Sequence, residues 1–207
     1  RFGNSALAKN TTGANNSAFG HFAAYNNTDG SSNTAIGANS SFYNVHGEQN
    51  TAIGAGSMCN NVGGELNTAV GSCALEGPFS LGSVGDKNVA IGAKALYDNQ
   101  GNYNVAVGCY ALIDNTDGSG NTAVGYQAGR DLSGNSNFNT FLGYNTDISS
   151  PTLTYNNSTA LGYNATIDAS NQIVLGTSSE KAKSPCAYVG LGIYSPSSGF
   201  TLAVGGD

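Results

Sequence analysis

Asn33-Thr34-Ala35-Ile36-Gly37 returns seventeen residues later as Asn50-Thr51-Ala52-Ile53-Gly54, and variants of these five residues occur ten times along the chain. Counted from a truncated copy that ends at Gly3, the final glycines are 17, 17, 17, 17, 21, 16, 17, 18, 19 and 14 residues apart. A nearly fixed period of this kind indicates stacked structural repeats, each burying its apolar face on its neighbours. We therefore expect one solenoid over residues 1–178 and a short C-terminal β segment, a fibre connector, over residues 179–207.

Each repeat is predicted to contain a β-strand, because a short apolar run is bounded by asparagine and glycine. Seventeen residues leave room for two strands of about five residues and two tight turns, in a coil of roughly 56 Å perimeter. Ten coils stacked ~4.8 Å apart would form a rod about 48 Å long. The sequence thus predicts an all-β protein, a parallel β-roll or β-solenoid of about ten coils.

Both faces of the predicted strand are apolar. With the repeat glycine as position 0, position −2 is small and position −1 is bulky in nearly every repeat, and neighbouring side chains in a strand point to opposite faces. A single roll buries only one face, and a small face lets two backbones approach closely, so we expect a homo-oligomer of parallel rolls. The alternative is a monomer whose own loops cover the second face.

Asparagine occupies position −4 in eight of the ten repeats. We expect these side chains to hydrogen-bond amide to amide along the rod, as in cross-β ladders. Position +3 is small, which predicts a second, tightly packed strand, and Leu75, Leu96 and Leu112 follow at position +4 as bulky fillers. Ala90→Leu is accordingly predicted to be far more damaging than Asn99→Ala, which is expected to alter only a turn.

The residues expected to carry the repeat fall into three rows. They are Gly37, Gly54, Gly71, Gly92, Gly108 and Gly125; Ala35, Ala52, Ala69, Ala90, Ala106 and Ala123; and Asn33, Asn50, Asn67, Asn88, Asn104 and Asn121.

The composition argues against several functional classes. A net charge of −6 and a pI of about 4.6 disfavour nucleic acid and anionic membranes as partners, and no apolar run is long enough to insert into a bilayer. The chain starts at Arg1, which suggests a fragment or a processed product. The cysteines at 59, 73, 109 and 186 lack CxxC spacing and a nearby histidine, so we expect free, half-buried thiols and neither a metal site nor a cofactor.

The repeated phrase, with Ala or Ser three residues past the glycine, closely resembles the head repeat of the YadA-like trimeric autotransporter adhesins. The resemblance covers roughly residues 1–178. It implies a left-handed parallel β-roll, three chains packed around a threefold axis, and an extracellular location on a cell or virion surface. The family's repeat is shorter, and only the last spacing here matches it. Without the resemblance, a right-handed crossover would be the general expectation.

A second resemblance lies at the C-terminal end of the chain. Residues 188–205, Tyr-Val-Gly-Leu-Gly-Ile-Tyr-Ser-Pro-Ser-Ser-Gly-Phe-Thr-Leu-Ala-Val-Gly, are similar to a segment of many tail fibres and surface fibres. In those proteins the segment often precedes further fibre domains. The similarity implies a fibre rather than a free soluble protein, and a native chain that continues past Asp207.

Candidate contact residues occur where the repeat is decorated. Tyr126, Tyr144 and Tyr163 each follow a repeat glycine and are expected to stack, with Tyr110 close by, either as a flat strip for sugar rings or a protein surface or as a purely structural ladder. The 21-residue spacing inserts a loop over residues 76–87 that carries Phe79 and Leu81. Its apolar tip either contacts a partner or folds back over the roll.

No catalytic set stands out in the sequence. Glu48 and Glu65 share an offset on adjacent coils, near the separation of a retaining glycosidase pair, but they read better as solvated turn residues. The near-identical segments 27–33 and 115–121 suggest a weak Ca²⁺ loop, although Asp-Gly turn chemistry explains them fully. We therefore expect no enzyme and no metal site.

The sequence favours a structural and adhesive part of a trimeric fibre that attaches to a host-surface glycan or protein receptor. Multivalent display would convert weak contacts into avidity. The first alternative is an ice-binding β-solenoid, suggested by threonines at position −3 that are interrupted by two valines. The second is a glycan-cleaving tailspike, which requires a groove with paired carboxylates.

Overall fold

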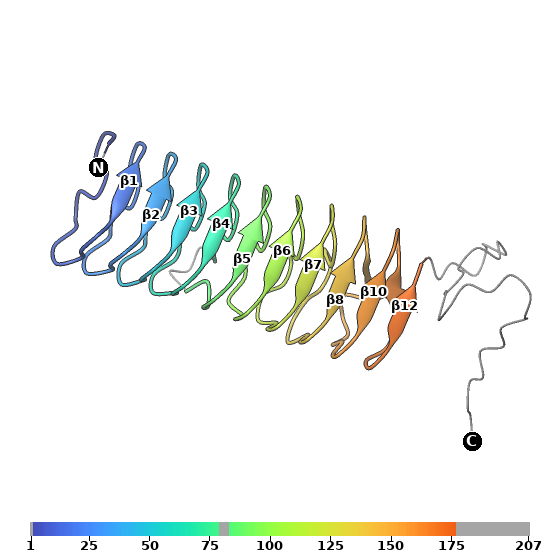
Figure 1. Ribbon diagram of the computed structural model, residues 1–207. Coiled ribbons are helices and arrows are strands. Elements are labelled where there is room, and N and C mark those ends of the chain that lie inside the picture. The colour runs from blue at the N-terminus through green and yellow to red at the C-terminus, as the bar shows by residue number, and fades with distance from the viewer. Residues whose placement is uncertain (1, 79–82, 177–207) are drawn as a thin grey trace, which may run out of the picture.

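The computed structural model describes residues 2–78 and 83–176, and within these residues the chain forms an all-β solenoid with no helix (Figure 1). The expected C-terminal segment 179–207 lies outside the described residues. One three-residue strand per coil builds a ten-stranded parallel sheet, in the order β1-β2-β3-β4-β5-β6-β7-β8-β10-β12. A second sheet pairs β9 with β11. The parallel solenoid with a period near 17 is confirmed.

The strands of the large sheet coincide with the repeated phrase. Their bounds are β1 Ser17–Phe19, β2 Thr34–Ile36, β3 Thr51–Ile53, β4 Thr68–Val70, β5 Val89–Ile91, β6 Val105–Val107, β7 Thr122–Val124, β8 Thr140–Leu142, β10 Thr159–Leu161 and β12 Ile173–Leu175. Each residue pairs with its counterpart in the next repeat: Ala69 lies beside Ala90, and Ala90 beside Ala106. The 21-residue and 16-residue spacings therefore leave the register of the sheet unchanged.

The small row faces the interior of the roll. The alanines at position −2 are fully buried within a single chain, and Leu75, Leu96 and Leu112 fill the interior from the opposite side, as expected. The small residues at position +3 are also buried. Close approach therefore occurs inside one roll, whereas the bulky position −1 row is on the outer face.

One coil exchanges a large residue for a small one. Phe141 in β8 stands where the other strands have alanine and is fully buried. In the preceding coil, Gly129 occupies the filler position, and a Cβ atom there would overlap the Phe141 ring and the Leu112 side chain. The missing side chain at Gly129 thus provides the volume for the ring, which keeps the interior close-packed.

The expected second strand is wrong for most of the rod. Among the described residues it is present only as β9, Asp147–Ile148, and β11, Thr166–Ile167. In the other coils the residues at positions +2 and +4 have positive φ, for example Lys94 at 56° and Leu96 at 51°, and this conformation interrupts an extended strand. No valine, isoleucine or threonine is among the non-glycine residues with positive φ in the described chain, since β-branched residues tolerate this region poorly.

The asparagines at position −4 form a continuous ladder, but they bond mainly to backbone groups; within the ladder, Asn139 Nδ2 also donates to the amide oxygen of Asn121 at 3.2 Å. In each step the Oδ1 atom accepts the backbone N–H of the equivalent residue in the next coil, as Asn50 does from Asn67 at 2.9 Å. The Nδ2 atom donates to a carbonyl of the next coil, as from Asn50 to Gly64 at 2.7 Å. We call this row the strand ladder; it consists of Asn16, Asn33, Asn50, Asn67, Asn88, Asn104, Asn121 and Asn139.

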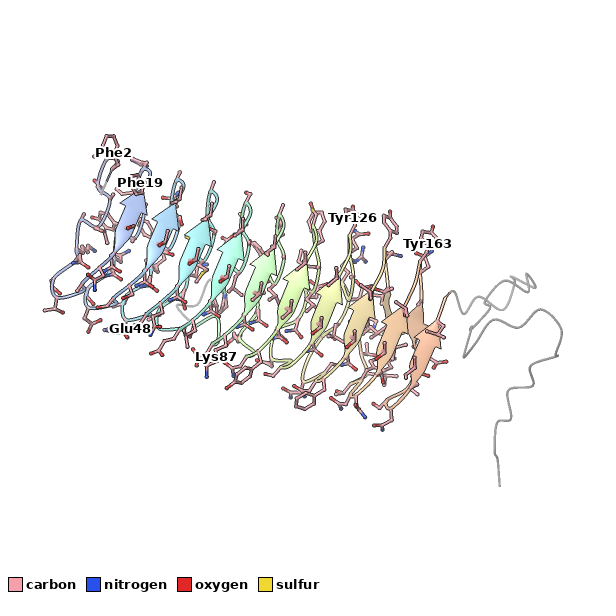
Figure 2. The ribbon with its side chains drawn as sticks, in the orientation of Figure 1. Phe2, Phe19, Glu48, Lys87, Tyr126 and Tyr163 are labelled. Carbon is pink, nitrogen blue, oxygen red and sulfur yellow. The ribbon has the colours of Figure 1, made fainter. Side chains whose placement is uncertain are left out.

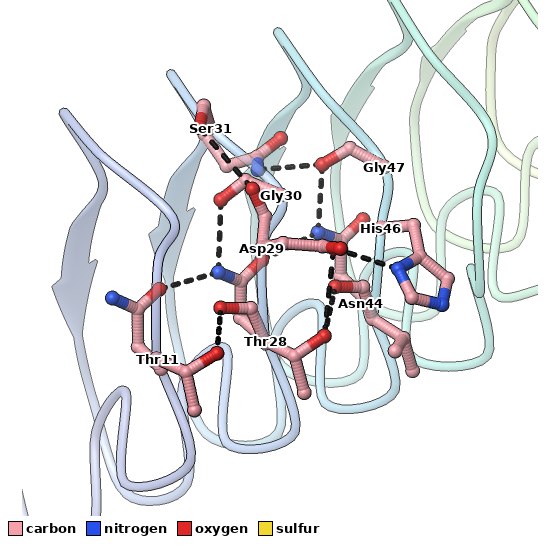
Figure 3. Close-up of polar contacts among 12 residues, drawn as sticks. Thr11, Thr28, Asp29, Gly30, Ser31, Asn44, His46 and Gly47 are labelled. Atoms are coloured by element: carbon pink, nitrogen blue, oxygen red, sulfur yellow. Dashed lines mark hydrogen bonds and ion pairs between the residues drawn. The ribbon is translucent and has the colours of Figure 1, made fainter.

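A second row, which the sequence analysis missed, does bond amide to amide. We call it the turn ladder; its members are Asn10, Asn27, Asn44, Asn61, Asn99 and Asn115. Asn44 donates through Nδ2 to Asn27 Oδ1 at 2.9 Å and to the carbonyl of Gly47, also at 2.9 Å (Figure 3). The recurring Asn-x-x-Gly spacing, as in residues 44–47 and 61–64, was the available signal.

The turn ladder corrects the expectation for Asn99. This residue is fully buried; its Nδ2 donates to the carbonyls of Val84 and Gly101, and its Oδ1 accepts from Asn104 and Asn115. Its removal would leave buried polar groups unpaired, at a cost of about 1–3 kcal/mol each. Asn99→Ala is therefore expected to be damaging and is not a mild control.

The inward alanine row gives a direct test. Ala90→Leu should lower the free energy of unfolding by about 1–3 kcal/mol or more, because the new side chain has no space between Ala69 and Ala106. Ile91→Leu, one residue further on the exposed face, should change it by less than about 1 kcal/mol. Denaturant unfolding of both variants checks this; equal losses would contradict the assignment of the two faces.

Candidate functional site

The outer face of the ten-stranded sheet is uncovered in the described chain. The position −1 side chains lie along it and are mostly 37–48% exposed: Phe19, Ile36, Ile53, Ile91, Val124, Leu142, Leu161 and Leu175. We call this row the aliphatic strip. Parallel sheets are normally covered on both faces, and within the described residues the chain covers only the inner one.

The predicted tyrosine ladder is present at one edge of this face (Figure 2). The ring centroids of Tyr126 and Tyr144 are 5.3 Å apart, and those of Tyr144 and Tyr163 are 5.6 Å apart, with interplanar angles of 20° and 18°. Tyr110 meets Tyr126 edge to face at 6.3 Å. Exposure rises from 41% at Tyr126 to 52% at Tyr144 and 64% at Tyr163.

The stacking changes what the ladder can bind. Parallel rings at these distances are offset-stacked, and each covers part of its neighbour's face. A flat strip on which successive sugars lie face to face is therefore not what the structure presents. The available groups are ring edges, a row of phenol hydroxyls, and the outer ring face of Tyr163 at the end of the stack.

The inserted loop is only partly described. Phe79 and Leu81 lie outside the described residues. Val84, near the end of the insertion, is fully buried and lies against Gly77. The second limb of the insertion therefore returns to the core of the roll.

The residues considered for catalysis or metal binding take part in hydrogen bonds and an ion pair between coils. Glu48 and Glu65 lie in register on adjacent coils, where their backbone carbonyls accept the N–H groups of Leu66 and Lys87. In the 27–33 segment, Asp29 pairs with His46 at 2.6 Å, and this hydrogen bond lowers the pKa of Asp29 (Figure 3). The described residues contain no group of three side chains suited to a metal ion and no helix with the length and apolar character of a membrane span.

The three described cysteines are free and half-buried, as expected; Cys186 lies outside the described residues. Burial, followed by the nearby negative charge of Glu76, raises the pKa of the Cys59 thiol to about 11. A thiol with this pKa is almost entirely protonated at neutral pH and is a poor nucleophile.

An acidic column runs along the return segments of the later coils. Asp98, Asp114 and Asp131 occupy position +6 in three successive coils, and Asp147 follows in the next. Burial raises the pKa of both Asp98 and Asp114. Arg130 is the paired cation here, with its Nε 2.7 Å from Asp131 Oδ1.

A shallow hollow of about 340 Å³ opens on the return segments of the first coils. It is lined by Lys9, Asn26, Thr28, Tyr43, Val45 and Val62. These residues occupy positions +6 and +8, which vary along the chain, so the repeat pattern did not single them out.

No protein-family model, no curated protein and no solved structure matches this chain. Its function therefore has to be inferred from its surfaces.

The most perturbed carboxyl group predicts a pH dependence. Burial, with Asp131 nearby, raises the pKa of Asp147 to about 7 from 3.8, so the folded state binds more protons than the unfolded state between these values. The contribution of Asp147 to stability is then fully present below about pH 4 and decreases as the pH rises towards 7. Asp147→Asn removes the buried charge but keeps Oδ1 as an acceptor for the N–H groups of Asp131 and Ile148.

The free energies of unfolding of the parent and of Asp147→Asn, measured with denaturant, should therefore differ more as the pH rises. At pH 8 the variant should be more stable, by about 1 kcal/mol or more, and near pH 4 the two should be nearly equal. The quantity to compare is the unfolding free energy of the variant minus that of the parent. If this difference were smaller at pH 8 than at pH 4, the assignment would be contradicted.

Proposed function

We propose that this chain is a non-enzymatic structural and adhesive segment of a fibre, assembled from copies of itself and displayed outside the cell or on a virion. The observation that carries the proposal is the aliphatic strip. Contiguous exposed apolar patches of more than a few hundred Å² mark association surfaces, and the residues of this one come from eight of the ten strands of the sheet, from β1 to β12. At ~4.8 Å per strand, the strip is about 43–48 Å long.

The regularity of the strip favours a second copy as its cover. Its bulky side chains repeat at the strand spacing, and a partner with the same spacing can fit between them along the whole length. Another roll of the same chain has the same spacing, because it is built from the same stacked strands. A closed arrangement of identical subunits also avoids leaving further copies of the strip exposed.

The resemblance of the repeat to YadA-like head repeats supports three chains around a threefold axis. In such an assembly the aliphatic strips would face one another and the return segments would face outward. Each outer surface would then occur three times, so weak contacts with a receptor would be multiplied. The tyrosine ladder is a candidate contact surface under this proposal.

Disruption of the strip tests assembly. Ile53→Lys combined with Ile91→Lys should convert the oligomer to folded monomer, since two charges per chain would have to be desolvated in the interface. Thr12→Lys with Gln100→Lys adds the same charge at exposed sites off the strip and should leave the oligomer intact. Light scattering with circular dichroism distinguishes the outcomes; a parent chain that is a stable monomer at micromolar concentration overturns the proposal.

Attachment through the ladder has its own test. Replacement of Tyr126, Tyr144 and Tyr163 by serine should weaken binding to receptor-bearing cells by about fivefold for each ring that contacts the receptor, because aromatic contacts contribute ~1 kcal/mol each. The oligomer should remain folded. Undiminished binding would mean that the ladder is only structural, and loss of the oligomer would mean that the rings belong to the subunit interface.

An ice-binding role remains a second candidate, because a specific observation favours it. The threonines at position −3 are half-buried on the same outer face as the aliphatic strip and are likewise in register: Thr34, Thr51, Thr68, Thr122, Thr140 and Thr159. Val89 and Val105 interrupt the row. An ice-recrystallisation assay separates the candidates, since a sheet face buried between subunits cannot contact ice.

A further inference from the structure

We propose that the hollow on the first coils is a binding site for an acidic sugar, such as a uronic or sialic acid residue. The inference deepens the proposed attachment function and rests on it, by naming the ligand class and a site distinct from the tyrosine ladder. At about 340 Å³ the hollow is at the lower end of the range for ligand sites. This size suits one or two sugar rings.

One wall of the hollow is a rigid apolar platform. Tyr43 is 37% exposed, and its ring meets Phe42 edge to face, with centroids 4.6 Å apart and planes at 80°. Phe42 in turn stacks on Tyr25 at 5.3 Å with an interplanar angle of 8°. Val45 and Val62 extend the wall along the rod.

This platform suits the apolar face of a sugar ring better than the tyrosine ladder does. The negative face of an aromatic ring attracts positively polarised C–H groups, and such groups cover one face of many sugars. The Tyr43 ring meets its aromatic neighbour Phe42 edge to face, whereas ring-on-ring stacking covers the faces in the ladder. The platform is also held by its aromatic neighbours, which reduces the entropic cost of binding.

A positively charged residue, Lys9, is also among the lining residues of the hollow. Lys9 Nζ donates to Asn26 Oδ1 at 2.9 Å and lies 5.1 Å from the centre of the Tyr25 ring, so the ammonium group is oriented by two neighbours. An ammonium group has three N–H donors. Among the described residues, the ion pairs are Asp29–His46 and Asp131–Arg130, so Lys9 has no carboxylate partner there. A ligand carboxylate would supply one.

The charge distribution along the rod favours an anion at this end. The chain carries a net charge of −6, and four aspartates of the acidic column lie on the return segments of the later coils. An anionic ligand is repelled there and finds Lys9 beside an apolar wall on the first coils. The carboxylate of Asp29, the residue next to the lining residue Thr28, is already paired with His46.

The hollow also remains accessible under the proposed assembly. All six lining residues belong to the return segments between strands, and none belongs to a strand of the sheet. Burial of the aliphatic strip between subunits would therefore leave the hollow on the outside of the fibre. A trimer would present it three times.

Ligand-observed NMR and calorimetry on the intact oligomer test the site with two defined probes, methyl glucuronoside and its uncharged counterpart methyl glucoside. The acidic probe should bind about fivefold more tightly than the neutral one at low salt, and the preference should shrink as salt is added. Lys9→Gln should abolish the preference, and Tyr43→Ser should weaken both probes. Equal binding of the two probes by the parent, or no binding of either, would overturn the inference.

Lys94→Gln is the matched control. Lys94 is also exposed and lies 5.2 Å over a tyrosine ring, that of Tyr97, but it is outside the hollow. The control should leave both affinities unchanged; a loss equal to that of Lys9→Gln would mean that general charge, not the hollow, drives binding. Light scattering on the same samples separates the two proposals: an oligomer that ignores the acidic probe refutes this site alone, and a monomer refutes the fibre alone.

Discussion

Coil-to-coil bonding by asparagine side chains is the interaction on which the rest of this structure depends. Short strands of three residues provide few ladder bonds, and every turn leaves backbone N–H and C=O groups without a strand partner. The strand ladder satisfies such groups in the neighbouring coil, as Asn50 does for Asn67 and Gly64. The turn ladder, where present, links coils amide to amide and also satisfies the carbonyl of its own turn, as Asn44 does for Asn27 and Gly47. Since an unpaired buried polar group costs about 1–3 kcal/mol, register errors that break these bonds would be costly at every coil.

The same constraint explains which irregularities the chain tolerates. Across the 21-residue spacing, Asn88 N–H still bonds to Asn67 Oδ1 at 2.8 Å, and Asn67 Nδ2 still reaches the carbonyl of Gly85, also at 2.8 Å. Extra residues are accepted between ladder positions, where the return segments vary. Function can therefore diversify on the return segments while the sheet and its aliphatic strip remain uniform. The Tyr43 hollow and the acidic column differ because the sequence of the return segments varies from coil to coil.

The repeated phrase was sufficient to predict the parallel solenoid, the buried fillers and the row of stacked tyrosines, because each follows from periodicity and alternation. It could not decide which apolar face turns inward: alanine fits both a close-packed interior and a close subunit contact. The second strand was wrong because non-glycine, unbranched residues such as Leu96 adopt positive φ, and the sequence pattern of small and bulky residues does not distinguish this conformation from an extended strand. The role of Asn99 was wrong because a buried asparagine and a turn asparagine look alike in sequence. The hollow escaped notice because Lys9, Tyr43 and Val62 come from different coils.

Residue-resolved hydrogen exchange by NMR tests the central claim most directly, since it reports whether the asparagine side chains hold successive coils together. The account predicts slow exchange for the backbone N–H groups of Asn67, Asn104 and Asn121 and for the Nδ2 protons of the strand ladder. They should exchange as slowly as the amides of the strands, because all of these hydrogen bonds break only when coils separate. The Nδ2 protons of exposed asparagines such as Asn39 and Asn135 should exchange far faster. Rapid exchange throughout the strand ladder, with protected strand amides, would show that the sheet alone holds the rod and would contradict the account.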